Sequence, residues 1–232
     1  MPDISALSES IQDYLKTIFT LRMNSDRVTT NAIAASLDVA AASVTGMLKK
    51  LAGMNLVEYE RYQGVRLTPA GEKIALEVIR HHRLIELYLT EAMGYSWDRV
   101  HDEAERMEHA ISEEFEERMA QLLGDPKFDP HGNPIPTKDG NIASFSRRRL
   151  SQVSSGETVR IERIQNEDPA LLRRVAALGL MPGADLTVVR QSASNGSGSV
   201  TVLLKTFAPD EGDGRPLRLE RDIADHIFVY EN

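Results

Sequence analysis

The chain has 232 residues, of which 41% are hydrophobic, and this composition suits a globular protein of two or three small domains. It contains no cysteine, which excludes disulfide bonds, cysteine-based zinc sites and thiol catalysis. No apolar run approaches the roughly 18 residues that span a bilayer, and the N-terminus lacks the charged and apolar segments of a signal peptide. We therefore expect a cytoplasmic protein.

The net charge of −8 is concentrated in one part of the chain. Residues 1–75 carry equal numbers of acidic and basic side chains, whereas residues 76–124 carry twelve Asp/Glu against five Lys/Arg. An acidic protein lacks the usual electrostatic signature of nucleic-acid binding, but the neutral N-terminal third leaves such a role open. Divalent cations would cancel part of the charge of the acidic segment.

The first 75 residues have the pattern of a winged helix-turn-helix. Apolar residues recur at helical spacing over residues 11–23. Thr30 can cap a second helix over residues 31–37, and a third helix follows after a short connection and ends at residue 51. Residues 57–67 then give two short strands around a Gln-Gly turn, which predicts a wing.

In such a unit the third helix enters the major groove of DNA, where small and polar side chains face base edges and basic side chains reach phosphates. The candidates for base contact are Ala42, Ser43, Thr45, Gly46 and Lys49. The candidates for phosphate contact are Lys50, Arg61 and Arg66. The alternative is a winged helix that contacts another protein, with these residues as ordinary helix surface.

Residues 68–123 predict two amphipathic helices, one over residues 68–91 and one over residues 97–123. His82 and Glu86 lie one turn apart on the first of them and share a face. Two helices of this length bury little apolar surface alone, so we expect them to complete their core by dimerisation. A symmetric dimer would also match a palindromic DNA site.

Potential metal ligands gather on the second predicted helix. At about 100° per residue, His101, Glu105, Glu108 and His109 fall within little more than one quadrant, beside an apolar stripe that ends at Phe115. Carboxylates and imidazoles at the edge of a core cost desolvation energy unless something neutralises them, and a divalent cation does so directly. The alternative is a solvated acidic face.

The remainder predicts a linker and a small β domain. Residues 141–156 are rich in turn-forming residues and include three consecutive arginines, as expected of a linker. His131, which precedes them, has no partner nearby in the sequence and is assigned no role. Five short strands and one helix follow, which favours a five-stranded SH3-like barrel. The predicted fold is mainly α with a small β domain.

Together these features resemble the diphtheria toxin repressor and manganese transport regulator family of metal-activated bacterial transcription factors. The most specific motifs are Asp13-Tyr-Leu, His82-Arg-Leu-Ile-Glu86, Val100-His-Asp-Glu-Ala-Glu-Arg-Met-Glu-His109 and Gly132-Asn-Pro-Ile-Pro136. The resemblance implies an N-terminal winged helix-turn-helix DNA-binding domain over residues 1–73 and a helical metal-binding and dimerisation domain over residues 74–140. Residues 157–232 would form an SH3-like domain similar to one shared with ferrous-iron transport proteins.

The resemblance also implies two metal sites. The primary site falls on Asp13, Glu105, Glu108 and His109. The ancillary site falls on His82, Glu86 and His101, with Glu167 or Asp168 of the barrel as a further ligand. The alternative for these two barrel residues is a helix-capping or surface role before Pro169.

Substitutions relative to the family bear on which metal is bound. Asp13 and Glu105 replace a methionine and a cysteine of the iron-sensing members, and oxygen ligands favour Mn²⁺ over Fe²⁺. Lys16 replaces a second carboxylate of the manganese-sensing members, so two closely spaced metal ions are not expected there.

The implied function is a Mn²⁺- or Fe²⁺-dependent regulator, a repressor of metal-uptake genes that binds palindromic operators as a homodimer. A metal that joins Asp13 to the dimerisation domain would order the recognition helices for DNA. The alternatives are a metalloenzyme and a metal storage or delivery protein, although the Glu-x-x-His and His-Glu-x-x-His motifs are absent. We expect double-stranded DNA and a second copy of the chain as partners, and no catalysis, membrane or small organic substrate.

Overall fold

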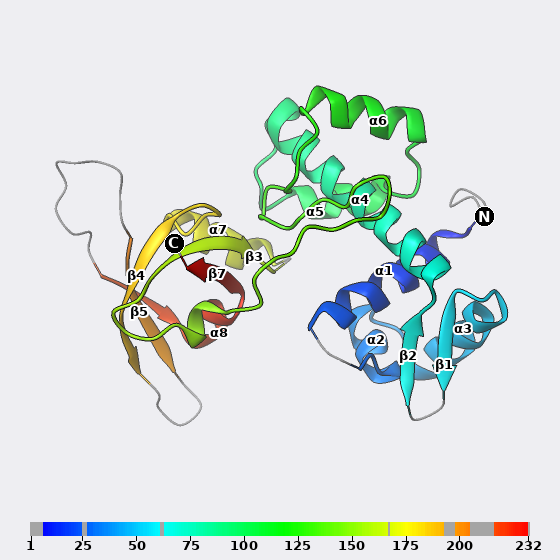
Figure 1. Ribbon diagram of the computed structural model, residues 1–232, viewed down its shortest axis with the longest axis horizontal. Coiled ribbons are helices and arrows are strands. Elements are labelled where there is room, and N and C mark those ends of the chain that lie inside the picture. The colour runs from blue at the N-terminus through cyan, green and yellow to red at the C-terminus, as the bar shows by residue number, and fades with distance from the viewer. Residues whose placement is uncertain are drawn as a thin grey trace. The chain divides into compact units, whose positions relative to one another are not determined.

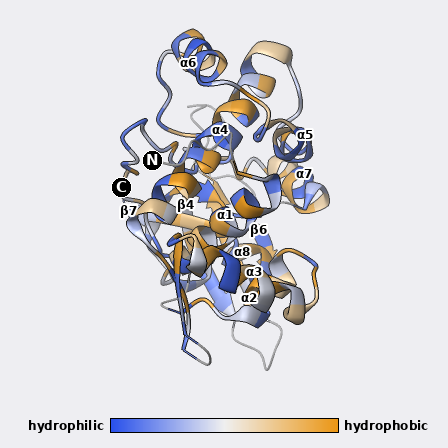
Figure 2. Ribbon diagram, turned by 90° about the vertical axis from the view of Figure 1, so that its right-hand side faces the viewer, coloured by the Kyte–Doolittle hydropathy of each residue, from blue (hydrophilic) through white to orange (hydrophobic). Residues whose placement is uncertain are grey.

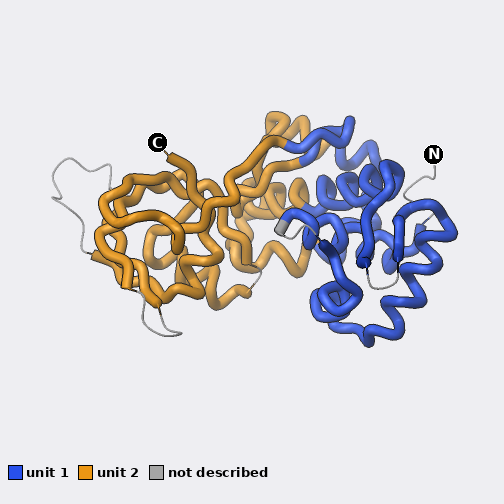
Figure 3. Tube along the Cα trace, turned by 60° about the horizontal axis from the view of Figure 1, so that its bottom comes forward, with its two compact units in different colours: residues 1–82, 105–117, 136–142 blue, residues 83–104, 118–135, 143–232 orange. Residues whose placement is uncertain are grey.

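The computed structural model describes residues 7–24, 27–60, 63–166, 168–192, 198–204 and 216–231 (Figure 1). The chain divides into two compact units (Figure 3). The first unit contains residues 1–82, 105–117 and 136–142, and the second contains residues 83–104, 118–135 and 143–232. Helix α4 (Pro69–Met93) contributes turns to both units.

The N-terminal part of the first unit is the predicted winged helix-turn-helix. Its elements are α1 (Glu9–Asn24), α2 (Thr30–Ser36), α3 (Ala41–Gly53), β1 (Val57–Glu60) and β2 (Gly64–Leu67). The two strands pair antiparallel, with Val57 opposite Leu67. Leu15, Ile33 and Leu48 are fully buried between the helices. The cap of α2 is Thr29 rather than the predicted Thr30, because the Thr29 side chain accepts from the amide of Ala32 at 3.1 Å.

Helix α4 begins at Pro69, as the Thr-Pro pair predicts. The Thr68 hydroxyl accepts from the amide of Gly71 at 3.1 Å, which satisfies one of the free donors of the first turn. Gly71 packs directly on the preceding chain, since a Cβ atom there would lie 2.0 Å from the carbonyl oxygen of Leu56. This close approach fixes where α4 leaves the wing.

The single helix predicted over residues 97–123 is wrong. The structure has α5 (Val100–Met107), a turn, and then α6 (Glu113–Leu122). Ser112 starts α6 by accepting from the amide of Phe115, and the acidic residues that follow favour a helix N-terminus. The apolar stripe predicted across this break therefore fails, because Phe115 is 44% exposed while Glu116 is buried.

The second unit contains the predicted small β domain. Its strands are β3 (Thr158–Ile164), β4 (Asp185–Ser192), β5 (Ser199–Leu204), β6 (Leu217–Glu220) and β7 (Ile227–Glu231), in the sheet order β6-β5-β4-β3-β7. Helix α7 (Pro169–Ala177) was predicted, whereas α8 (Arg221–Asp225) and the 3-10 turn Leu150–Gln152 were not. Part of the predicted linker is core, because Leu150 and Val153 are completely buried.

Hydrophilic and hydrophobic residues alternate along the helices (Figure 2), as amphipathic packing requires. In the described part of the chain no single helix is long and apolar enough to cross a membrane. Helices α2 and α3 have the length and composition of a membrane span only when they are counted together, and the chain bends by 111° between them.

Candidate metal centre and DNA interface

Side chains from α1 and from the turn after α5 converge in the first unit. Asp13 on α1, and Glu108 and His109 just beyond the end of α5, offer ligand atoms that all lie within 4.8 Å of one another. His109 Nε2 lies 2.9 Å from Asp13 Oδ1 and 3.5 Å from Glu108 Oε1. Glu108 is completely buried. We call these three residues the α1 site.

The orientation of the His109 ring is set by a residue that the sequence did not single out. His109 Nδ1 lies 2.8 Å from Gln12 Oε1, which can only accept, so Nδ1 carries the proton and Nε2 faces the α1 site. Gln12 is itself held by donating to the carbonyl of Leu7 at 3.2 Å. Such an outer hydrogen bond is typical of histidines that bind metals.

Lys16 enters the group from the side of α1, one turn beyond Asp13. Its ammonium donates to both oxygens of Glu108 at 2.9 and 2.8 Å, contacts Glu105, and lies 3.3 Å from His82 Nδ1. Burial lowers the pKa of Lys16, but the charges of Glu108 and Glu105 outweigh this effect and raise it. Lys16 therefore stays protonated and provides a permanent positive charge between the two glutamates.

His82, placed with the ancillary ligands by resemblance, also reaches this group. Its Nδ1 lies 2.5 Å from Glu108 Oε2 and 3.8 Å from Glu105 Oε1. In the first unit the predicted residues Asp13, His82, Glu105, Glu108 and His109 thus lie close together around Lys16.

The residues of the α1 site, together with the adjacent Glu105 and Lys16, fit a divalent cation. Asp13, Glu105 and Glu108 bring three negative charges and Lys16 returns one, so two remain to be neutralised. Burial lowers the pKa of His109, whereas its hydrogen bond to Asp13 and the charges of Glu108 and Asp13 raise it above its usual value. In the absence of metal, a proton on His109 supplies part of that charge. Metal binding would displace this proton.

A second group of potential ligands lies in the second unit. Glu86 Oε1 is 3.5 Å from His101 Nδ1, and Glu86 Oε2 is 3.6 Å from His131 Nδ1. Glu86, Asp129 and His131 are all buried and offer ligand atoms within 4.8 Å of one another. His101 thus belongs with Glu86, and the four residues predicted to share one helix face form two separate groups.

His131, to which the sequence assigned no role, has several partners. Its Nε2 lies 2.9 Å from the carbonyl of Trp97, and its ring stacks on that tryptophan with centroids 5.1 Å apart. Burial lowers the pKa of His131, but the hydrogen bond and charge of Glu86 and the charge of Asp129 raise it to about 9. The signal available in the sequence was the run Asp129-Pro-His131-Gly, two acid or imidazole groups before a glycine turn.

Of the two barrel residues predicted as ancillary ligands, the structure describes Asp168. Asp168 caps α7, because its Oδ1 accepts from the amide of Ala170 at 2.9 Å, which is the capping alternative. It belongs to no group of potential ligands among the described residues. Glu167 lies outside the described residues.

The predicted DNA-contacting surface of α3 is exposed. Ala42, Ser43, Gly46, Lys49 and Lys50 are open to solvent. Thr45 is half-buried, and its hydroxyl donates to the carbonyl of Ala41 at 3.0 Å, a hydrogen bond within α3. On the wing, Arg66 is exposed and lines a groove together with Glu58 and Glu60. Arg61 lies outside the described residues.

Comparison with known proteins identifies the family of this chain. Residues 6–65 match the domain described as "Iron dependent repressor, N-terminal DNA binding domain", residues 68–137 match "Iron dependent repressor, metal binding and dimerisation domain", and residues 148–231 match the FeoA domain. The iron-dependent repressor IdeR of Mycobacterium leprae is 31% identical over 202 residues, which cover 82% of this chain and 87% of the relative. The chain belongs to the iron-dependent repressor family.

Two further relatives agree with this assignment. The diphtheria toxin repressor of Corynebacterium jeikeium is 28% identical and covers 84% of this chain and 93% of its own length. A solved structure described as a manganese-dependent transcriptional repressor in complex with manganese is 35% identical. It matches 96% of this chain and 100% of its own, with a TM-score of 0.87. The predicted family and fold class are therefore confirmed.

Proposed function

We propose that this member of the iron-dependent repressor family is activated by Mn²⁺ and represses metal-uptake genes, binding palindromic DNA as a homodimer in the cytoplasm. The observation that carries the proposal is the convergence of Asp13 with Glu108 and His109. Asp13 lies in the part of the chain that matches the DNA-binding domain, and the other two lie in the part that matches the metal-binding and dimerisation domain. Ligation by all three would couple these two domains.

The charges around the α1 site explain why metal binding would be coupled to DNA binding. Without a divalent cation, Asp13, Glu105 and Glu108 repel one another, and Lys16 and a proton on His109 offset part of this charge. A divalent cation supplies the missing positive charge at the three ligands. Holding Asp13 in place fixes α1, and with it the α3 surface that faces DNA. Metal should then raise DNA affinity, and DNA should raise metal affinity by the same factor.

Manganese is favoured by the donor atoms. The described α1 site offers carboxylate oxygens and one imidazole nitrogen, and oxygen ligands suit hard cations such as Mn²⁺. The solved relative with a TM-score of 0.87 is described as a complex with manganese, which agrees with this choice. The relatives described as iron-dependent repressors are 29 to 31% identical to this chain, a range that overlaps the manganese-described structures, so the donor atoms carry the choice of metal.

The test is the metal dependence of DNA binding. A duplex is first selected from a random pool by the Mn²⁺-loaded protein, and its affinity is measured by mobility shift with and without Mn²⁺. We expect Mn²⁺ to raise affinity at least tenfold, and Asp13→Asn to abolish most of that gain. Glu9→Gln, an exposed acid on the same helix, is the matched control and should behave as the wild type.

Three results would overturn the proposal. If Mn²⁺ raised the DNA affinity of Asp13→Asn as much as that of the wild type, Asp13 would not couple metal binding to DNA binding. Failure to select any duplex would favour the storage or enzyme alternatives. A larger stimulation by anaerobic Fe²⁺ than by Mn²⁺ at matched free concentration would reassign the metal.

A further inference from the structure

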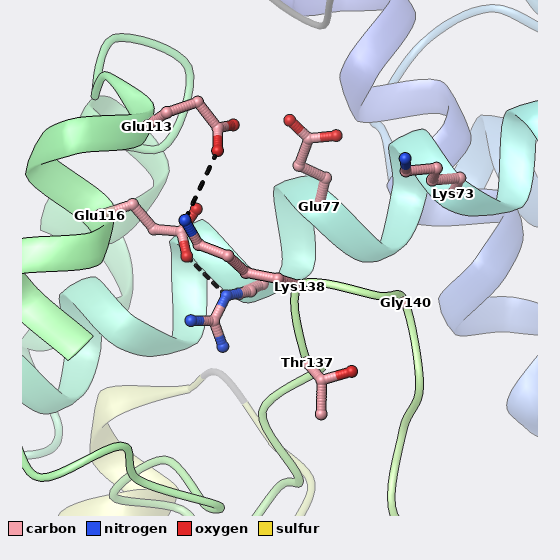
Figure 4. A pocket seen from close by; sticks show the side chains of 8 residues that line it. Lys73, Glu77, Glu113, Glu116, Thr137, Lys138 and Gly140 are labelled. Carbon is pink, nitrogen blue, oxygen red and sulfur yellow. Dashed lines mark hydrogen bonds and ion pairs between the residues drawn. The ribbon is translucent and has the colours of Figure 1, made fainter. Parts of the chain in front are cut away.

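Helices α4 and α6 and the turn after residue 136 enclose a pocket of about 170 Å³ in the first unit. Figure 4 shows the side chains that line it, among them three carboxylates: Glu77 from α4, and Glu113 and Glu116 from α6. None of the three belongs to the α1 site or to the group around Glu86. The proposed function assigns this pocket no role.

A buried histidine of α4, His81, reaches the same carboxylates. His81 is 3% exposed, and its Nδ1 lies 3.0 Å from the carbonyl oxygen of Glu108. Since a carbonyl only accepts, Nδ1 must carry a proton, and in the neutral ring Nε2 presents a lone pair. Nε2 makes no hydrogen bond with any described residue, but it lies 3.4 Å from Glu116 Oε2. Burial lowers the pKa of His81, whereas Glu116 and the Glu108 backbone outweigh this effect and raise it, so a metal would displace a proton from Nε2. Metal-binding histidines commonly donate their other ring N–H to a backbone carbonyl, and the orientation of His81 is compatible with that role.

The carboxylates around His81 share the pocket with three cationic side chains, Lys73, Arg80 and Lys138. Glu77, His81 and Glu113 offer ligand atoms within 4.8 Å of one another. Burial, and then the hydrogen bond and charge of Glu113, raise the pKa of Glu77 to about 7, because two carboxylates this close do not readily ionise together. Glu116 is already paired with Arg80 at 2.5 Å. Lys138 stands 4.0 Å from Glu113, and nearly half of its side chain is exposed.

We propose that Glu77, His81 and Glu113 form a separate divalent-cation site, the α4–α6 site, which takes Mn²⁺ or Zn²⁺ through one imidazole nitrogen and two carboxylate oxygens. Such a mixed set suits borderline cations and leaves further positions for water. Binding there would hold the first turn of α6 against α4. His81 also connects the site to the α1 site, since its Nδ1 donates to the backbone of the ligand Glu108.

The experiment uses the full chain and two probes, Mn²⁺ and Zn²⁺. Crystals of the wild type are soaked in MnCl₂, and an anomalous difference map is calculated at the manganese edge. In parallel, bound metal per chain is measured by equilibrium dialysis for the wild type, for Glu77→Gln with Glu113→Gln, and for Glu117→Gln. Glu117 is the control, because it lies on α6, is more than half exposed, and belongs to no group of potential ligands among the described residues. It pairs with Lys138 at 3.5 Å, so this variant also shows what loss of a Lys138 ion pair alone does to metal binding.

We expect an anomalous peak between Glu77, His81 and Glu113, a loss of about one bound ion per chain in the double variant, and no loss in Glu117→Gln. The map of the wild type does not depend on how the variants fold. Crystals with a peak at the α1 site and none at the α4–α6 site would overturn the inference, as would equal metal content in the double variant and the control. Neither result touches the proposed function, whose test is DNA binding by Asp13→Asn.

Discussion

At the residue scale, Lys16 determines how many cations the α1 site and the adjacent Glu105 and His82 can hold. Its ammonium occupies the space between Glu105, Glu108 and His82, where the resemblance places a second carboxylate in manganese-sensing relatives. A tethered ammonium and a divalent metal cannot share that space. One metal ion at the α1 site is therefore the expected loading.

Lys16→Glu tests this reading. The substitution removes the ammonium and adds a carboxylate, so we expect Mn²⁺ binding by titration calorimetry to increase by about one ion per chain, and the metal-free protein to melt at a lower temperature because like charges are left unpaired. Lys49→Glu makes the same charge change on the exposed face of α3. Equal Mn²⁺ stoichiometry in Lys16→Glu and the wild type would show that Lys16 does not block a second ion.

The site residues that were not predicted from the sequence were missed for one physical reason. Gln12 and His131 act through contacts with residues far away in the chain, His109 and Glu86 respectively. No local periodicity reports such contacts. By contrast, Asp13 was predicted because motif resemblance carries long-range geometry that spacing alone lacks, whereas Glu108 and His109 were also indicated by helical spacing.

At the scale of elements, the close packing of α4 on the wing depends on one glycine. A Cβ atom at Gly71 would lie 2.0 Å from the carbonyl oxygen of Leu56, whereas real Cβ contacts with backbone are longer than 3 Å. The carbonyl also accepts from the amide of Thr68 at 3.0 Å, so it cannot simply move away. The start of α4 must shift if residue 71 has a side chain.

We expect Gly71→Ala to destabilise the protein by about 2 kcal/mol or more, as overpacking against backbone does. Gly53→Ala, at a helical glycine with nothing within 4 Å of its Cβ position, should be neutral or stabilising by up to about 1 kcal/mol. Urea unfolding of the metal-free full chain measures both. Coinciding midpoints for the two variants would contradict the packing argument.

Most elements could be predicted from the sequence, and the exceptions are instructive. The winged helix-turn-helix, α4 and the five strands were found because their periodicity and turn signals agree. The break between α5 and α6 was missed because the helical wheel ran through Ser112, whose capping role competes with continued helix only at close range. That error placed Phe115 in the core.

At the scale of the whole molecule, exposed apolar side chains on α6 support the proposed homodimer. Leu122 is 68% exposed and Phe115 is 44% exposed on this helix. The helix lies within the residues that match a metal-binding and dimerisation domain, 68–137. Burial of such side chains against a second copy would recover their hydrophobic free energy.

We expect Leu122→Lys to weaken self-association at least tenfold, equivalent to about 1.4 kcal/mol, in sedimentation equilibrium of the Mn²⁺-loaded protein. Met54→Lys is the control, because Met54 is 40% exposed and follows α3 in the DNA-binding part. If both variants remain as dimeric as the wild type, the dimer does not use this end of α6.

The stacking of His131 on Trp97 gives the protein an optical reporter of its own. Trp97 is the single tryptophan of the chain, so its emission comes from one place, against the ring that contacts Glu86. A protonated imidazole quenches indole fluorescence more strongly than a neutral one. Any event that changes the charge or position of His131 is therefore visible in unlabelled protein, at concentrations too low for calorimetry.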